Sequence, residues 1–168
     1  MSRFTFFTLF ISISLLFSQQ TQSYSWEDGE TILGSYGNLT DAMNVGETNG
    51  VSPYDGNSML TVSESPLSGT PQAFIGYVTE LNEGDEVTAC YYGYDVTSSN
   101  PSLRIWGNYA SNDDITSYAG SASGNSTYSS GIGWEQLCHT WTIPAGKEAL
   151  VIQARLYSAS DDPTQYFI

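Results

Sequence analysis

Short segments in which apolar and polar residues alternate recur along the chain after about residue 24. The clearest is Val87–Asp95 (VTACYYGYD), which lies between the turn-forming segments NEGD and TSSNP. Short runs of β-branched and aromatic residues, bounded by Gly, Pro, Asn, Asp and Ser, predict β-strands. The pattern predicts strands at Tyr24–Gly29, Ser58–Ser63, Gln72–Leu81, Val87–Val96, Leu103–Ala110, Trp134–Ile143, Ala149–Tyr157 and Gln165–Ile168.

No segment after residue 24 shows a sustained helical period. Short strands at regular spacing are typical of an all-β sandwich, so we expect one all-β domain over residues 24–168. Two stretches are expected to be loops. One is the glycine-punctuated segment from residue 30 to about Tyr54, and the other is Ser111–Gly133, whose length indicates either a functional or a mobile loop.

Alternation along a strand assigns its side chains to two faces. One set is expected in the core: Leu60, Val62, Phe74, Val87, Ala89, Leu103, Ile105, Leu137, Trp141, Ile152 and Leu156. The outward set combines aromatic rings with Arg, Asn and Gln: Tyr92, Tyr94, Arg104, Trp106, Asn108, Gln153, Arg155 and Tyr157. Aromatic rings stack on sugar rings and the polar groups hydrogen-bond hydroxyls, so this set predicts a carbohydrate site on one sheet face. The alternative is ordinary sheet chemistry under a loop.

The first residues have the composition of a secretory signal peptide. Arg3 precedes an apolar run from Phe4 to Phe17, and the polar SQQTQS follows. The run is short for a membrane span, and small residues suited to cleavage come after it. We predict a signal peptide at residues 1–23, cleaved after Ser23, and a secreted domain without a membrane span.

The expected mature chain is strongly acidic. Once Arg3 is removed, three basic residues remain against 18 acidic ones. Such a charge repels nucleic acid and anionic membranes and excludes both as favoured partners.

Two further features fit a secreted chain. Cys90 and Cys138 fall on the outward sets of their strands and are expected to form a disulfide, the alternative being two buried free thiols. Asn38 and Asn125 begin N-glycosylation sequons, so the protein is a candidate glycoprotein.

Four motifs occur in a distinctive order: WEDG at Trp26–Gly29, DGNS at Asp55–Ser58 before MLTVS, LNEGDEVTACYYGYD, and GWEQLCHTWTIPAG. In this order the chain resembles the calcium-dependent jelly-roll carbohydrate-binding modules found beside xylanases and cellulases, within the galactose-binding-like group. The resemblance covers nearly all of residues 24–168. It implies a two-sheet antiparallel jelly-roll sandwich that binds a polysaccharide or glycan.

The resemblance also implies a structural calcium ion. Its ligands would be the Glu27 side chain and a carbonyl of Gly56 or Asn57, since Ca²⁺ prefers oxygen ligands. The family's third ligand, an Asp after the last strand, has no counterpart before the chain ends at Ile168. We therefore expect a truncated last strand in a piece of a longer protein, the alternative being an incomplete site.

We expect no catalytic activity. The single histidine, His139, falls on the inward set of its strand, and the acids gather in turns rather than at outward strand positions. A glycosidase pair needs two carboxyl groups held across one cleft. The alternative to a carbohydrate-binding domain is a structural subunit of an extracellular matrix, coat or filament that self-assembles through the same β-sandwich; a small glycosidase is a third, weaker interpretation.

Overall fold

The computed structural model describes residues 19–64, 68–95, 103–125, 133–156 and 164–167. Within these ranges the chain forms ten β-strands and no helix, which confirms the prediction of an all-β protein. None of the described segments is therefore a helix of the length and apolarity needed to cross a membrane. The predicted signal peptide lies mostly outside the described residues.

The ten strands form two five-stranded sheets, and every pairing between described strands is antiparallel. Sheet A has the spatial order β1 (Gly34–Tyr36), β4 (Gln72–Val78), β9 (Ala149–Leu156), β6 (Leu103–Ala110) and β7 (Ser121–Gly124). Sheet B has the order β2 (Thr40–Val45), β3 (Ser58–Glu64), β10 (Thr164–Phe167), β5 (Glu86–Asp95) and β8 (Gly133–Thr142).

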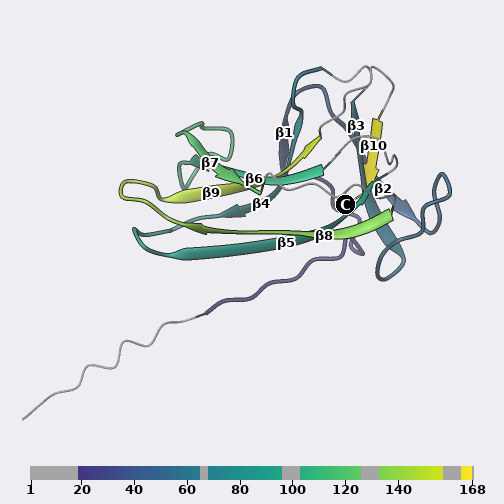
Figure 1. The fold of residues 1–168 in the computed structure, drawn as a ribbon, viewed down its shortest axis with the longest axis horizontal. Helices are drawn as coiled ribbons and strands as arrows, with labels where there is room; N and C mark the ends of the chain where they lie inside the picture. Colours follow the sequence, from purple (N-terminus) through teal and green to yellow (C-terminus); the bar gives the residue numbers. More distant parts are fainter. Residues whose placement is uncertain (1–18, 65–67, 96–102, 126–132, 157–163, 168) are drawn as a thin grey trace, which may run out of the picture.

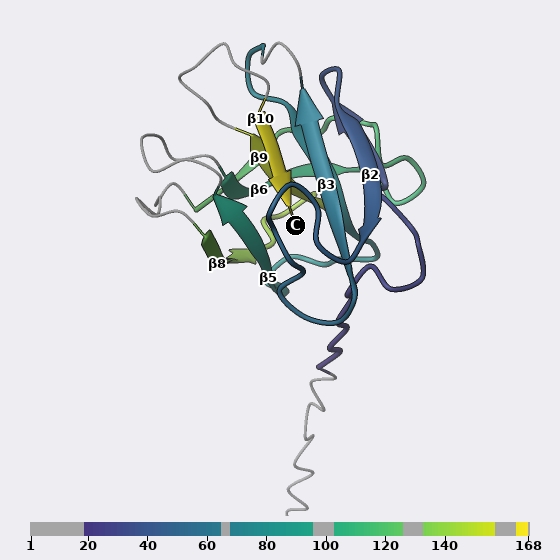
Figure 2. The same cartoon turned by 90° about the vertical axis from the view of Figure 1, so that its right-hand side faces the viewer.

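Strands of the two sheets lie in two layers. Figure 1 shows β4, β6 and β9 above β5 and β8, with β2, β3 and β10 gathered at one end of the molecule. Figure 2 looks onto that end and shows β3 and β10 side by side. In both views the first described residues run away from the sheets.

Apolar side chains from both sheets meet in one core between them. Sheet A contributes Ala73, Ile105, Tyr109, Leu150, Ile152, Ala154 and Leu156. Sheet B contributes Leu60, Val62, Tyr91, Leu137 and Trp141. The alternation read from β5, β6, β8 and β9 is thus confirmed, because the burial of apolar surface selects one face of each strand.

Several side chains on the outer face of sheet A are also buried. Val151 and Gln153 were assigned to an outward set, yet both are fully buried in the central strand β9. Phe74, expected between the sheets, instead packs on this outer face with Val151. Both alternating sets of β4 contain apolar residues and its register shifts between Phe74 and Gly76, so its sequence pattern could not decide which set faces the core.

Seven of the predicted strands are present, with ends shifted by at most three residues. The first predicted strand is wrong, since residues 24–29 contain no strand and residues 26–28 form a bend and a turn, with Trp26 at a φ of 61°. Three short strands were missed: β1 and β2 lie in the first expected loop and β7 lies in the second. These strands are short and polar, and their alternation is weak because they lie at or near the sheet edges.

Cys90 and Cys138 form the predicted disulfide. They are directly opposite each other in the ladder between β5 and β8, with Cα atoms 4.1 Å apart. The bond joins the two strands on the outer side of sheet B, where Thr88 and Thr140 also form a hydrogen bond of 2.8 Å. Secreted proteins keep such bonds, because their surroundings are oxidising.

Candidate functional site

Most residues of the predicted carbohydrate site lie together on the outer face of sheet A. Residues directly opposite each other in an antiparallel sheet point to the same side. Arg155 of β9 is directly opposite Gln72 of β4 and Arg104 of β6, so the three form one row. Two residues along, Gln153 lies between Phe74 and Trp106. We call the following set the sheet A face: Gln72, Phe74, Arg104, Trp106, Asn108, Gln153 and Arg155.

A network of polar and cation–π contacts joins four of these side chains, Asn108, Gln153, Arg155 and Trp106. The Gln153 amide nitrogen donates to Asn108 Oδ1, and Arg155 Nε donates to Gln153 Oε1 at 3.3 Å. The Arg155 guanidinium lies over the Trp106 ring, 4.5 Å from its centroid. Trp106 Nε1 in turn donates to Ser121 Oγ of β7 at 3.1 Å.

Burial divides the sheet A face into a base and a rim. Gln153 and Asn108 are buried, whereas Arg104, Trp106 and Arg155 are half-buried. A buried network that satisfies its polar groups fixes the side chains above it. The half-buried Arg155 guanidinium and Trp106 indole are therefore held in position.

The placement of charge on this face is unusual for the chain. Arg104 and Arg155 are directly opposite each other, although the chain carries only four Lys and Arg residues and a net charge of −14. Like charges directly opposite in a sheet are destabilising.

The prediction of a single face is wrong for the tyrosines. Tyr92 and Tyr94 belong to β5 in sheet B, whereas Arg104 and Arg155 belong to β6 and β9 in sheet A. Alternation gives the face of a strand but not the sheet it joins, so the two sets could not be separated from the sequence. Tyr157 lies outside the described residues.

Tyr92 and Tyr94 are part of a separate aromatic cluster on sheet B. The Tyr54 ring stacks on Tyr92 with centroids 3.7 Å apart and 16° between the planes. Trp134 packs against Tyr54 and Tyr94, and its Nε1 donates to the Ser52 carbonyl at 3.0 Å. The adjacent Tyr92 hydroxyl raises the pKa of Tyr54 above its ordinary value of 10.0. Sequence reasoning missed Tyr54 and Trp134 as members of this cluster, because the contacts join segments far apart in the chain.

Comparison with known proteins does not place the chain in a family. No family model, no curated protein and no solved structure matches it. Its function is therefore inferred from its own residues.

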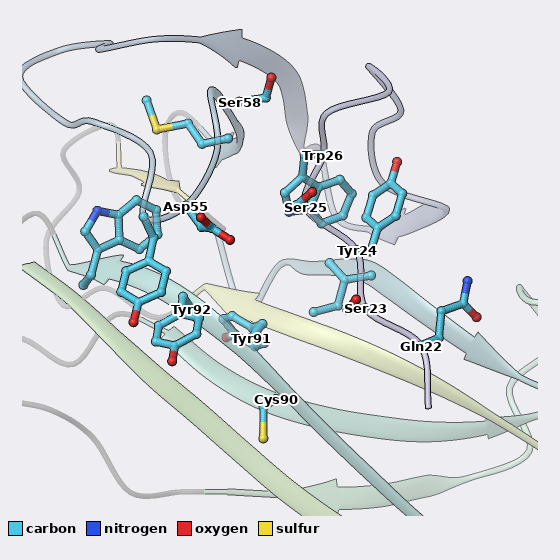
Figure 3. Close-up of a pocket in the computed structure, with 14 residues that line it drawn as sticks. Gln22, Ser23, Tyr24, Ser25, Trp26, Asp55, Ser58, Cys90, Tyr91 and Tyr92 are labelled. Atoms are coloured by element: carbon cyan, nitrogen blue, oxygen red, sulfur yellow. The ribbon is translucent and has the colours of Figure 1, made fainter. Parts of the chain in front are cut away.

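A cavity of about 540 Å³ lies beside the aromatic cluster. Figure 3 shows the segment Gln22–Trp26 along one side of it and Tyr91 and Tyr92 on the other. Ser58 and Met59 of β3 and Ile75 of β4 complete much of the lining. The cavity thus lies between β3 and β5 of sheet B, on the side of the molecule away from the sheet A face.

The three predicted calcium ligands do come together, but as a hydrogen-bonded turn. Glu27 Oε1 accepts the backbone N–H groups of Asn57 and Ser58, each at 2.7 Å. These donors lower the pKa of Glu27 below its ordinary value of 4.5. Gly56 has a φ of +65°, and a Cβ atom there would clash with the Glu27 carboxylate.

This arrangement does not fit the expected ligand set. The turn presents N–H groups to Glu27, whereas Ca²⁺ requires oxygen ligands. The described residues also contain no group of three or more His, Cys, Asp or Glu side chains able to hold a metal ion. Calcium binding stays a prediction, and the structure accounts for Glu27 as an anchor of the N-terminal segment.

The remaining candidate residues have local roles. His139 is half-buried and packs edge-on against Trp141, with ring centroids 4.8 Å apart. Asn38 is exposed, whereas Asn125 is half-buried and its Nδ2 donates to the Cys138 carbonyl at 3.3 Å. The two sequon asparagines therefore differ in exposure.

Proposed function

We propose that this chain is a non-catalytic carbohydrate-binding domain of a secreted protein, with a jelly-roll connection of its strands, and that it holds a polysaccharide on the sheet A face. The observation that carries the proposal is the row of Gln72, Arg155 and Arg104 beside the Trp106 ring. Neighbouring strands are about 4.8 Å apart, so the row presents hydrogen-bond donors over roughly 10 Å.

The two guanidinium groups favour an acidic polysaccharide over a neutral one. Arginine donates two parallel hydrogen bonds to a carboxylate or an ester sulfate, and the planar Trp106 ring offers an apolar surface beside them. Among the described residues, the contacts of Arg155 are with Gln153 and Trp106, and neither is an acid. An acidic sugar would supply a negative charge beside the Arg155 guanidinium.

Native gel electrophoresis through immobilised polysaccharides tests this proposal. Pectate offers carboxylates, dextran sulfate offers sulfate esters, and dextran is the neutral control. We expect an acidic gel to retard the protein at about 0.15 M salt, where charges more than about 8 Å apart are screened. Arg155→Gln should weaken binding by about 1.5–3 kcal/mol, the value of a hydrogen bond to a charged group.

Lys147→Gln is the matched control, because Lys147 carries the same charge and its Nζ donates to the Ala119 carbonyl, away from the Arg155 row. It should leave retardation unchanged. Equal losses of retardation in the two variants would show that the net charge of the protein, and not the Arg155 site, causes the binding. The absence of retardation in all three gels would contradict the proposal that the sheet A face binds carbohydrate.

One observation favours the alternative of a self-assembling structural subunit. β8 is ten residues long and lies at the edge of sheet B, where described strands pair with it on one side only. Long edge strands can pair with another chain. Concentration-dependent sedimentation of the wild-type protein, abolished by Thr140→Pro in β8, would support this alternative.

A further inference from the structure

The cavity beside the aromatic cluster is walled largely by aromatic rings. Figure 3 shows Trp26 on one side of it and Tyr91 and Tyr92 on the other. A cavity of about 540 Å³ with apolar, aromatic walls has the size and lining of a small-molecule site. Its aromatic side chains come from the N-terminal segment, the turn before β3, β5 and β8: Tyr24, Trp26, Tyr54, Tyr91, Tyr92 and Trp134.

The polar groups on four of these rings already have partners. The Tyr24 hydroxyl donates to the Asp28 carboxylate, and the Tyr54 hydroxyl forms a hydrogen bond with that of Tyr92. Trp134 Nε1 donates to a backbone carbonyl at 3.0 Å. These side chains therefore offer a ligand their ring surfaces rather than free hydrogen-bonding groups.

The charge around the cavity is negative. The lining contains one carboxylate, that of Asp55, and no Lys, Arg or His. Asp55 is exposed, so it lies where the cavity opens to solvent, and its Oδ1 accepts the Gly56 N–H at 2.9 Å. Glu27 brings a second carboxylate to the edge, because it accepts the N–H of Ser58, another lining residue, at 2.7 Å. Such a site repels anions and attracts cations.

We propose that this cavity binds a small organic cation that carries a quaternary ammonium group. The face of a Trp or Tyr ring attracts a cation, and aromatic cages are the usual sites for quaternary ammonium ions. Tyr24 and Trp26 are at 87° to each other, and Tyr54 and Trp134 are at 60°. The walls thus present ring faces in several directions.

The pairing of the polar groups distinguishes this ligand from a sugar. A quaternary ammonium group has no N–H and needs no hydrogen-bond acceptor, whereas the hydroxyls of a buried sugar need donors and acceptors. The rings and both carboxylates belong to residues 24–168, the expected mature chain. The inference is independent of carbohydrate binding on the sheet A face, which lies on the other side of the molecule.

NMR of the indole N–H groups tests the proposal with choline as the probe. Its control is 3,3-dimethylbutan-1-ol, in which carbon replaces the charged nitrogen. The chain has four tryptophans. Trp26 and Trp134 line the cavity, whereas Trp106 lies under Arg155 and Trp141 is in the core. Choline should shift the first two signals saturably, leave the other two unchanged, and bind at least about tenfold more tightly than the neutral alcohol.

Three variants separate the cavity from the net charge of the protein. Trp26→Leu keeps an apolar side chain but removes a ring, so choline should bind about tenfold more weakly, as read from the Trp134 signal. Asp55→Asn keeps an oxygen for the Gly56 N–H, and the loss should be about threefold, because exposed ion pairs are weak. Asp113→Asn removes the same charge from an exposed position near Tyr77 of β4 and should change nothing.

Three results would overturn the proposal. The first is the absence of saturable shifts in the Trp26 and Trp134 signals. The second is equal affinity for choline and the neutral alcohol, which would show that the cavity selects apolar bulk and not charge. The third is an equal loss in Asp55→Asn and Asp113→Asn, which would show that choline follows the net charge. The last two comparisons hold even if Trp26→Leu does not fold.

Discussion

The carboxylate of Glu27 accepts the backbone N–H of Ser58 at 2.7 Å, although the two residues are 31 positions apart in the chain. The same oxygen accepts the N–H of Asn57. This contact fastens the segment before β1 to the first residue of β3, and it uses backbone donors that a strand end would otherwise leave open to water.

Glu27→Gln should lower Tm, because an uncharged amide oxygen accepts the two hydrogen bonds more weakly than a carboxylate does. The loss should be the same in a chelator and in excess calcium, since both donors are backbone N–H groups. A loss seen only with calcium would show that Glu27 is a metal ligand, as the resemblance implied. Glu30→Gln is the control on the same segment.

The same contact makes stability depend on pH. The folded-state pKa of Glu27 is lowered from 4.5, so the unfolded chain binds the proton first as the pH falls. The Glu27 contact stabilises the fold fully when the pH is above the unfolded-state pKa of Glu27. This stabilisation is lost as the pH falls through the lower folded-state pKa. The Tm difference between wild type and Glu27→Gln should therefore shrink from about pH 6 to about pH 3; a constant difference would contradict the assignment.

Removing the disulfide should destabilise the domain substantially. The bond spans 48 residues, for which the chain-entropy model gives about 4 kcal/mol. Urea unfolding of the Cys90→Ala, Cys138→Ala double variant measures this loss against the oxidised wild type. The reduced wild type should unfold at nearly the same urea concentration as the double variant. A loss below about 1 kcal/mol would mean that the reduced, unfolded chain already keeps the two cysteines close together.

The two sequons should behave differently in a eukaryotic secretory host. Asn38 is exposed, whereas the Asn125 side chain is half-buried against the Cys138 carbonyl. Asn38→Gln should therefore remove a glycan and lower the glycan mass of the secreted protein, and Asn125→Gln should leave the glycan mass unchanged. The opposite pattern would show that the Asn125 side chain is accessible during secretion. The measurement is the intact mass before and after enzymatic removal of N-glycans.

Several features of the site followed from local chemistry. Alternation in β5 and β8 placed both cysteines on outer positions, and the structure bonds them. The same reasoning placed Arg104, Trp106 and Arg155 on one side of their strands, where they now lie together. The burial of these side chains was not foreseen, because it depends on the neighbours that Phe74 and Gln153 bring from β4 and β9.

The sequence itself determined the positions of seven strands and the faces of β5, β6, β8 and β9, because the two-residue period of a strand is a local property of the backbone. Only the tertiary structure decided which sheet each strand joins, and this put Tyr92 and Tyr94 on sheet B and the arginines on sheet A. It also decided that Tyr54 would stack on Tyr92 and that Glu27 would bind the turn before β3. Such contacts depend on how the strands pair across the chain, and no local pattern encodes that pairing.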